Sequence, residues 1–246
     1  MEITIDAVMK TIQKDDDTFF ELLKPIIEGP KKYMSYCSSA LNVIETKLKV
    51  LNDEFSFAHE RNPIDTIEKR IKDADSLRKK LRRMGFKPPG NTQTDLRQIE
   101  KFIEENIHDI AGIRVICPFI DDVYMLADCL ARQDDIKPLE RKDYIARPKE
   151  SGYRSLHLII ETPIFLQNEK RYVKVEIQLR TIAMDFWANL EHRLQYKKNI
   201  DLETAKRISA ELFECAETSA RLDLKMQSIR DGIDHNSFET EREKTA

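Results

Sequence analysis

Hydrophobic and polar residues alternate strictly over residues 173–180, within the stretch 171–180. The apolar members share one parity, and the other parity carries Lys174, Glu176, Gln178 and Arg180. A repeat of two residues is typical of a β-strand, so we expect the apolar face to meet the core. Solvent is the ordinary partner of a charged strand face. The neighbours of this strand therefore decide whether its polar face has a function.

A second alternating run covers residues 153–161 and carries Tyr153, Ser155 and His157 on one parity. A connection through Pro163 and Asn168 leads from this run into the first one, so the sequence predicts an antiparallel pair. Residues 109–117 are also strand-like, and a proline ends them.

Apolar residues three and four positions apart indicate amphipathic helices over several other stretches. The expected helices are 31–55, 73–85, 95–106, 121–132, 182–196 and 205–229. The helix at 73–85 has Asp73 or Asp75 as its N-cap and Gly85 just past its end. The stripes of 31–55 and 205–229 have coiled-coil spacing, so these helices can pack on each other, on the sheet or on another subunit.

The order of elements is helical, then mixed, then helical. This order predicts an α+β fold with one mixed, largely antiparallel β-sheet flanked by helices. We divide the chain into an N-terminal helical extension, a central domain of mixed strands and helices, a C-terminal helix for packing or oligomerisation, and a polar tail expected to be disordered. The boundaries are 1–58, 59–200, 201–231 and 232–246.

The composition is that of a water-soluble protein with one good core, because 41% of the 246 residues are apolar and 35% are charged. No apolar run is long enough to span a membrane, and the N-terminus does not resemble a signal peptide. We therefore expect a cytoplasmic protein without a membrane partner. The four cysteines are widely spaced, which favours neither a zinc site nor a disulfide framework.

The charge is unevenly distributed along a chain whose formal net charge is −3. Residues 68–87 contain nine Lys or Arg and three acids, a local balance of 9 − 3 = +6. An anion is the expected partner of this basic block. A polyphosphate or a short nucleic-acid contact suits it better than duplex nucleic acid, for which a broader basic surface is needed.

Phosphoryl-group transfer between nucleotides needs a metal held by carboxylates, cations for a polyphosphate, and a base for the attacking hydroxyl. Asp109 and Glu176, on different strands, can supply the carboxylates, and the basic block can supply the cations. Tyr153 offers a ring on which a base can stack, with His157 as its polar neighbour. Solvated acids and an ordinary Tyr/His pair at a sheet edge are the structural alternatives.

Four motifs make the chemistry more specific. In chain order they are Arg70–Lys72 (RIK) with the following basic helix, Asp109–Arg114 (DIAGIR), Pro148–His157 (PKESGYRSLH) and Val175–Thr181 (VEIQLRT). Together they resemble the synthetase domain of the RelA/SpoT family over roughly residues 60–200. The resemblance implies a nucleotidyltransferase-like sheet. It also implies a GTP pyrophosphokinase of the stringent response, which transfers the β,γ-pyrophosphate of ATP to the 3′-hydroxyl of GTP or GDP and yields (p)ppGpp and AMP.

The resemblance also implies roles for individual residues. Asp109 and Glu176 correspond to the catalytic acids that hold Mg²⁺, and Glu176 would also accept the proton of the 3′-hydroxyl. The residues implied for ATP are Arg70, Lys72, Lys80, Arg83 and Arg114, with Arg70 and Arg114 sandwiching the adenine. The residues implied for GTP or GDP are Lys142, Lys149, Tyr153, His157 and Gln178, with Tyr153 stacking on the guanine.

The chain length resembles the stand-alone small synthetases, which form homotetramers through their terminal helices. No hydrolase activity is expected, because the long members of the family carry a preceding hydrolase domain with a His-Asp metal motif. The dipeptide His108-Asp109 does not supply this motif, since Asp109 belongs to the synthetase motif and only His59 lies upstream. Some small synthetases are activated by their product, but Thr66, Glu68 and Asp185 stand where that site would have other residues. We therefore do not expect product activation, while regulation by RNA stays open.

Two other functions compete with this one. A nucleotidyltransferase of related architecture would attack the α-phosphorus of ATP and release pyrophosphate. An RNA-binding module built on residues 68–87 would bind RNA in a salt-dependent manner without turning over nucleotides.

Overall fold

The structure is a computed structural model, and it describes residues 31–86, 101–195 and 201–245. Its strands are β1 (Thr66–Ile71), β2 (Ala111–Cys117), β3 (Lys137–Asp143), β4 (Leu156–Phe165) and β5 (Lys170–Thr181). Its helices are α2 (Lys31–His59), α3 (Ala74–Arg83), α5 (Ile120–Ala131), α6 (Ile182–Gln195) and α7 (Leu202–Thr245), and a short helix covers 101–106.

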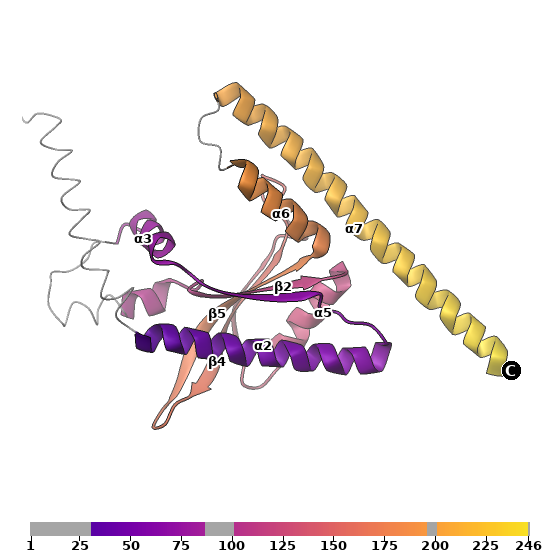
Figure 1. Cartoon of the computed structure of the whole chain (residues 1–246), viewed down its shortest axis with the longest axis horizontal. Helices are drawn as coiled ribbons and strands as arrows, with labels where there is room; N and C mark the ends of the chain where they lie inside the picture. Colours follow the sequence, from indigo (N-terminus) through magenta and orange to yellow (C-terminus); the bar gives the residue numbers. More distant parts are fainter. Residues whose placement is uncertain (1–30, 87–100, 196–200, 246) are drawn as a thin grey trace, which may run out of the picture.

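The strands form one mixed sheet in the order β1-β2-β5-β4-β3 (Figure 1). β2 and β5 are parallel, and the other three neighbouring pairs are antiparallel. The predicted α+β fold with a mixed, largely antiparallel sheet is therefore confirmed. β5 is central: it joins the β1–β2 pair to the β4–β3 pair.

The predicted hairpin of β4 and β5 is present, and His157 lies opposite Gln178 in it. β4 is longer than expected. The sequence analysis started the connection at Pro163, but the strand continues to Phe165, and Pro163 pairs with Tyr172. Proline fits here because the pairing of β4 with β3 reaches only Glu161, so beyond this point the missing N–H has no neighbouring strand on that side.

Helices α2 and α5 cover the apolar face of the sheet (Figure 1). The predicted stripe of α2 supplies Cys37, Leu41, Ile44 and Leu48 to the main core, where all four are buried. Val175 and Ile177 of β5 meet the same core, as the alternation in the sequence predicted. The polar parity of β5 therefore points to the opposite face.

Helix α7 lies along α6 and reaches the sheet through a few specific contacts (Figure 1). The indole Nε1 of Trp187 donates to the carbonyl of Leu212 at 2.9 Å. The buried Asp223 accepts a hydrogen bond from the hydroxyl of Thr181, and the same hydroxyl accepts from the N–H of Met184 in the first turn of α6. These contacts fix α7 at the end of β5.

The far part of α7 contacts the N-terminus of α5. The Oε1 atom of Gln227 accepts hydrogen bonds from the N–H groups of Ile120 and Asp121, at 3.1 and 3.2 Å. Arg230 pairs with Asp121 as well. Gln227 thus satisfies backbone donors that a helix start leaves without partners.

Several expectations differ from the structure or lie outside its described residues. β1 and β3, which form the two edges of the sheet and have mostly exposed residues, were not predicted from the sequence. A disordered tail was expected from residue 232, whereas α7 continues to Thr245. Residues 1–30, and the part of the 95–106 helix before residue 101, are outside the described residues. No helix within the described residues is both long and apolar enough to cross a membrane.

Candidate active site

The polar face of the sheet is organised in rows that run across the strands. In one row Arg70 of β1 lies opposite Gly112 of β2, which lies opposite Glu176 of β5. The next row crosses all five strands, and it contains Glu68, Arg114, Gln178, His157 and Lys142. Pairing between strands therefore gathers residues that are up to 110 positions apart in the sequence (178 − 68 = 110).

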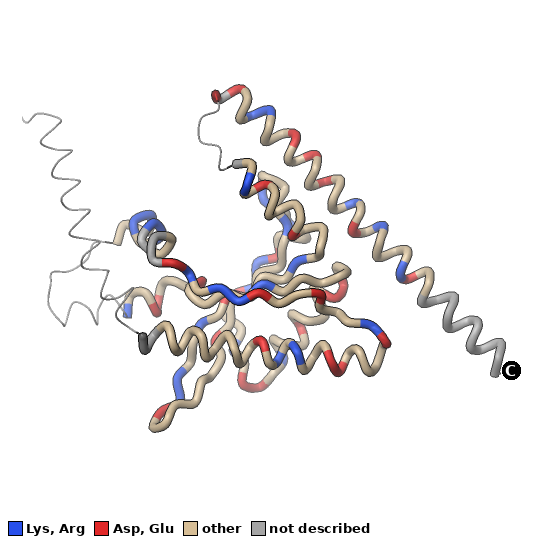
Figure 2. The backbone as a smooth tube through the Cα atoms, in the orientation of Figure 1, with Lys and Arg blue, Asp and Glu red and all other residues tan. Residues whose placement is uncertain are grey.

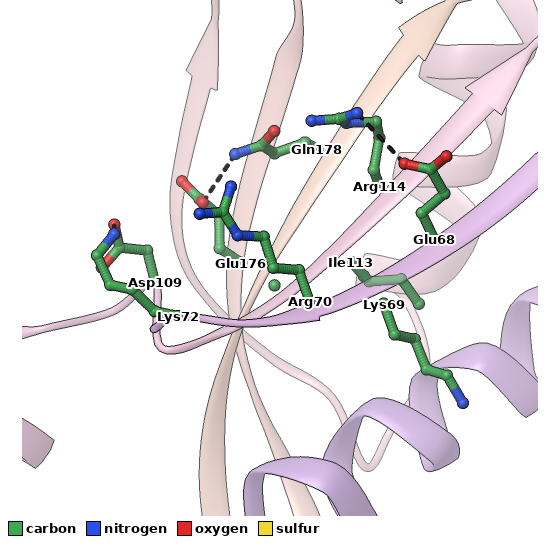
Figure 3. Close-up of a pocket in the computed structure, with 10 residues that line it drawn as sticks. Glu68, Lys69, Arg70, Lys72, Asp109, Ile113, Arg114, Glu176 and Gln178 are labelled. Atoms are coloured by element: carbon green, nitrogen blue, oxygen red, sulfur yellow. Dashed lines mark hydrogen bonds and ion pairs between the residues drawn. The ribbon is translucent and has the colours of Figure 1, made fainter. Parts of the chain in front are cut away.

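A pocket of about 680 Å³ opens over these rows (Figure 3). Gly112 lies between Arg70 and Glu176 and has no side chain to fill the space between them. The lining residues are Glu68, Lys69, Arg70, Lys72, Asp109, Gly112, Ile113, Arg114, Glu176 and Gln178. The lining is mostly charged, which suits a charged ligand better than an apolar one.

Asp109 lies just before β2 and contacts two lysines. The Nζ atom of Lys72, which follows β1, lies 2.8 Å from one carboxylate oxygen, and the Nζ atom of Lys80 on α3 lies 2.8 Å from the other. Partial burial raises the pKa of Asp109, but the hydrogen bonds from both lysines outweigh it and hold the pKa below its usual value. Asp109 is therefore ionised at neutral pH.

The lysines come from a strongly basic region. Figure 2 shows Lys and Arg concentrated on α3 and along the neighbouring β1. The Asp73 side chain accepts from the N–H of Ser76 and begins α3, and Gly85 with φ of 69° follows its end, so the predicted boundaries of this helix are confirmed. The carboxylate of Asp73 also lies 3.5 Å from Arg70, whose side chain is 71% exposed.

Glu176 is the second carboxylate of the pocket. Its Oε1 atom lies 3.2 Å from the Nδ1 of His157. Its Oε2 atom accepts from the Nε2 of Gln178 at 2.9 Å, a contact that Figure 3 shows. Burial and the charge of Asp109 raise the pKa of Glu176. The contacts with His157 and Gln178 lower the pKa by more than this, so it ends below its usual value. The carboxylate is therefore ionised and ready to accept a proton or hold a cation.

The residues expected to bind the acceptor nucleotide lie beside Glu176. The hydroxyl of Tyr153 lies 3.0 Å from the Nε2 of His157. The Nζ of Lys149 lies 4.7 Å from the ring centres of both Tyr153 and Tyr144. Tyr144 also meets His157 edge-on, at 5.3 Å between ring centres. Aromatic rings and cations together suit a purine base with phosphates.

The structure brings some predicted residues into the pocket and leaves others outside. Arg114 lines the pocket and pairs with Glu68 at 3.3 Å. Lys142 stands at the far end of its row, beyond His157, and pairs with Glu140 at 2.9 Å. Arg83 does not line the pocket: it is exposed, and its Nε donates to the carbonyl of Lys79 in its own helix. In this arrangement Arg83 therefore lies outside the pocket, and its binding of a phosphate stays a prediction.

Three residues without a predicted role contact residues of the site: Tyr144, Arg180 and Asp185. Arg180 shares the polar parity of Glu176 and Gln178, so the alternation contained a signal for it. Asp185 lies in the first turn of α6, where no strand parity applies. Tyr144 lies just after β3, one of the strands that the sequence analysis missed.

Metal binding would rely on few protein ligands. Among the described residues, no group of three or more His, Cys, Asp or Glu side chains is arranged to hold a metal ion. Two ionised carboxylates, Asp109 and Glu176, nevertheless line one pocket. Magnesium is commonly held in this way, by one or two carboxylates together with the phosphates of its substrate.

Comparisons with known proteins agree on one family. Residues 69–201 match the family model described as a region found in RelA/SpoT proteins. The chain is 42% identical to GTP pyrophosphokinase YwaC of Bacillus subtilis, over 88% of this chain and 98% of that protein. It is 33% identical to GTP pyrophosphokinase YjbM of the same organism, over 83% and 90% of the two chains.

Solved structures give the same result. The small alarmone synthetase 2 of Bacillus subtilis is 41% identical, with a TM-score of 0.68, and the match covers 82% of this chain and 98% of that chain. The small alarmone synthetase 1 of Bacillus subtilis, bound to its product pppGpp, is 32% identical with a TM-score of 0.70. That match covers 83% of this chain and 97% of that chain.

Proposed function

This chain belongs to the RelA/SpoT family and is a GTP pyrophosphokinase, and we propose that the pocket over β1, β2 and β5 is its active site. The reaction transfers the β,γ-pyrophosphate of ATP to the 3′-hydroxyl of GTP or GDP. The 3′-oxygen forms a bond to the β-phosphorus, the bond from this phosphorus to the α,β-bridging oxygen breaks, and AMP leaves. The observation that carries the proposal is the presence of Asp109, Glu176 and several cations in one pocket.

Glu176 is proposed to take the proton from the 3′-hydroxyl. A ribose hydroxyl is a weak acid, so a carboxylate in contact with it assists the attack on phosphorus. The side chains of His157 and Gln178 hold both oxygens of Glu176 and thereby limit its rotation. A fixed carboxylate keeps the geometry for attack without further reorganisation.

The donor side of the pocket is proposed to bind ATP. The polyphosphate would draw Lys72 and Lys80 away from Asp109, because phosphate oxygens are strong acceptors for ammonium groups. Arg70 and Arg114 are proposed to bind the adenine between their planar guanidinium groups, which stack well on aromatic faces. Arg70 is largely exposed and therefore able to reorient.

Asp109 and Glu176 are the residues that would hold Mg²⁺ in this pocket. Their oxygens are of the hard type that magnesium prefers, and they lie beside the cations proposed for the phosphates. When bound, the ion would neutralise the charge that develops on the transferred group.

The acceptor side is proposed to bind GTP or GDP. Tyr153 would stack on the guanine, Lys149 and Lys142 would approach the phosphates, and His157 would lie near the ribose. Lys149 now covers the ring of Tyr153 and must move aside for a base. A lysine on a flexible stem makes this movement easily.

We propose further that the enzyme is a homotetramer in the cytoplasm, where its nucleotide substrates are found. Apolar side chains of α6 and α7 are exposed in the protomer, and Phe186 (65%), Leu222 (55%) and Met226 (50%) are examples. These side chains supply an apolar surface for assembly. Sedimentation analysis of the wild type and of Met226→Glu tests it, and a wild type that sediments as a monomer would contradict it.

One incubation tests the function. Purified protein with Mg²⁺, labelled ATP and either GDP or GTP should yield AMP and a guanine nucleotide carrying the label at its 3′ position. Release of pyrophosphate instead of AMP would select the nucleotidyltransferase alternative. Salt-dependent RNA binding without turnover would select the RNA-binding alternative.

A further inference from the structure

Arg180 is buried beneath the candidate acceptor side, with only 5% of its surface exposed. Its Nη2 atom donates to the hydroxyl of Tyr153 at 2.6 Å and to the Oε1 of Gln178 at 3.2 Å. Its guanidinium carbon also lies 5.1 Å from the ring centre of Tyr153. One cation thus contacts two of the residues predicted to meet the guanine nucleotide, Tyr153 and Gln178.

Asp185 holds the other side of this guanidinium. Its Oδ1 atom accepts from the Nη1 of Arg180 at 3.2 Å, and the same oxygen lies 3.4 Å from the Nη1 of Arg114. The second oxygen accepts from the amide of Asn189 at 2.7 Å. Asp185 lies in the first turn of α6, where the helix dipole favours a negative charge.

A chain of polar contacts therefore connects Arg114 and Gln178, which line the pocket, with Tyr153 beside it. It runs from Arg114, proposed to bind adenine, through Asp185 to Arg180, and from there to Tyr153 and Gln178. Arg180 is too buried to contact a nucleotide itself. Its role must be exerted through the side chains that it holds.

We propose that Arg180 and Asp185 are positioning residues for the reaction. Arg180 fixes Tyr153 and Gln178 for the guanine nucleotide, and Asp185 fixes Arg180 and Arg114 together, so that the acceptor and donor sides are set by one carboxylate. This inference rests on the proposed function of the pocket. It adds a difference between the two residues: Arg180 positions side chains for one nucleotide, and Asp185 positions side chains for both.

A purely structural ion pair is the alternative. Buried ion pairs contribute little net stability, because the desolvation of both charges offsets their attraction. Within the described residues, the Nε of Arg180 has no hydrogen-bond partner. A buried donor without a partner lowers the free energy of unfolding, so this ion pair contributes still less to stability. The placement of two guanidinium groups around one carboxylate is better explained by the side chains that they position.

Steady-state kinetics with each substrate varied in turn separates these roles. For Arg180→Gln, which removes the charge at similar length, we expect the KM for GDP to rise roughly tenfold, as the loss of hydrogen bonds from a charged group implies, while the KM for ATP stays within about twofold. For Asp185→Asn, both KM values should rise. Arg180→Lys keeps the charge but not the fork of donors, so it should give an intermediate KM for GDP.

The matched control is Glu191→Gln, which removes a carboxylate from the same helix without touching the chain of contacts. It should leave both KM values unchanged. Fluorescence of Trp187 and the midpoint of thermal unfolding report whether each variant is folded. Titration calorimetry with GDP measures the acceptor affinity without turnover.

The outcomes are distinguishable. A wild type that binds GDP but makes no product contradicts the proposed function, and weaker GDP binding by Arg180→Gln would still support the positioning role. Folded variants with unaltered KM values and GDP affinity contradict the positioning role in an active enzyme. Equal increases of both KM values in Arg180→Gln would also overturn it, because Arg180 is assigned to the acceptor alone.

Discussion

The ammonium group of Lys80 lies 2.8 Å from the Oδ1 atom of Asp109, although the lysine lies on α3 and the aspartate lies just before β2. Lys72 takes the other oxygen at the same distance. Two lysines proposed for ATP phosphates thus balance the charge of a proposed metal ligand. When ATP binds, we therefore expect Lys72 and Lys80 to exchange their contacts with Asp109 for contacts with phosphate oxygens.

Loss of Lys80 should weaken ATP binding selectively. In Lys80→Met the polyphosphate loses one cation, and we expect the KM for ATP to rise roughly tenfold, in line with one hydrogen bond between charged groups. The KM for GDP should change less. Lys79→Met is the matched control, because Lys79 is an exposed lysine on the same helix. Equal effects of the two substitutions would contradict the assignment of Lys80.

Glu176→Gln should abolish most of the activity while keeping the fold. The amide can still meet Gln178 and His157, but it cannot accept the proton of a hydroxyl. A loss of about 10²-fold or more in kcat is expected for a missing general base. The release of AMP at saturating substrates measures it. A variant that retains the wild-type rate would refute the role given to Glu176.

Tyr153→Ala and Tyr153→Phe separate the ring from its hydroxyl. Removal of the ring should raise the KM for the guanine nucleotide roughly tenfold or more, which corresponds to the stacking of one base. The phenylalanine variant keeps the stacking surface and loses the contacts with Arg180 and His157. It should therefore be affected less. If both variants behave alike, the hydroxyl rather than the ring is what matters.

Gly152→Ala should destabilise the contact between α7 and the loop that carries Gly152. Gly152 has φ of 88°, and a Cβ there would lie 2.6 Å from the Cβ of Ala216. We expect a loss of about 1–3 kcal/mol in the free energy of unfolding. The control is Gly232→Ala, where a Cβ would meet nothing within 4 Å and the helix should gain about 0.5–1 kcal/mol. Chemical denaturation of both variants measures the difference.

The buried Asp223 predicts a specific dependence of stability on pH. Burial raises its pKa above the usual 3.8, and the hydrogen bond from Thr181 only partly offsets this. A raised pKa means that the group stabilises the fold at pH values below its usual pKa and loses this contribution as the pH rises through the folded value. The ionised form of Asp223 is therefore unfavourable in the fold at neutral pH.

Asp223→Asn removes this titration and can still accept from Thr181. The stability of the wild type relative to this variant should fall as the pH rises from the usual pKa of 3.8 through the raised pKa of the folded state. Thermal unfolding at several pH values measures it. A constant difference across this range would show that Asp223 does not titrate as expected.

The strength of the sequence patterns decided which elements could be predicted. The alternation in β5 and the apolar stripe of α2 each predict one buried face. In the structure both elements are present and both faces contact the core, so these predictions are confirmed. β1 and β3 form the edges of the sheet, and their charged, exposed residues hide the period of a strand. For α7 the expected seam included Leu222 and Met226, which are exposed, whereas the helix packs through Ala216 and Asp223.

The candidate site follows the same division. Family motifs mark Asp109, Glu176 and Tyr153 because these residues lie in continuous conspicuous stretches. The contacts of Arg180 and Asp185 depend on how β5 continues into α6, and no local pattern contains that geometry. The contacts of the Arg83 side chain likewise depend on its rotamer, which the sequence does not determine.

The strand order has a consequence for how the enzyme is made. Before β5 is synthesised, the β1–β2 pair and the β3–β4 pair share no backbone hydrogen bonds, since β5 alone lies between them. The growing chain on the ribosome therefore contains two unconnected halves of the sheet, with Asp109 in one and His157 in the other. Insertion of the last strand closes the sheet and delivers Glu176 in the same event. On the proposed mechanism, an incomplete chain that ends before this strand lacks its general base and cannot transfer pyrophosphate.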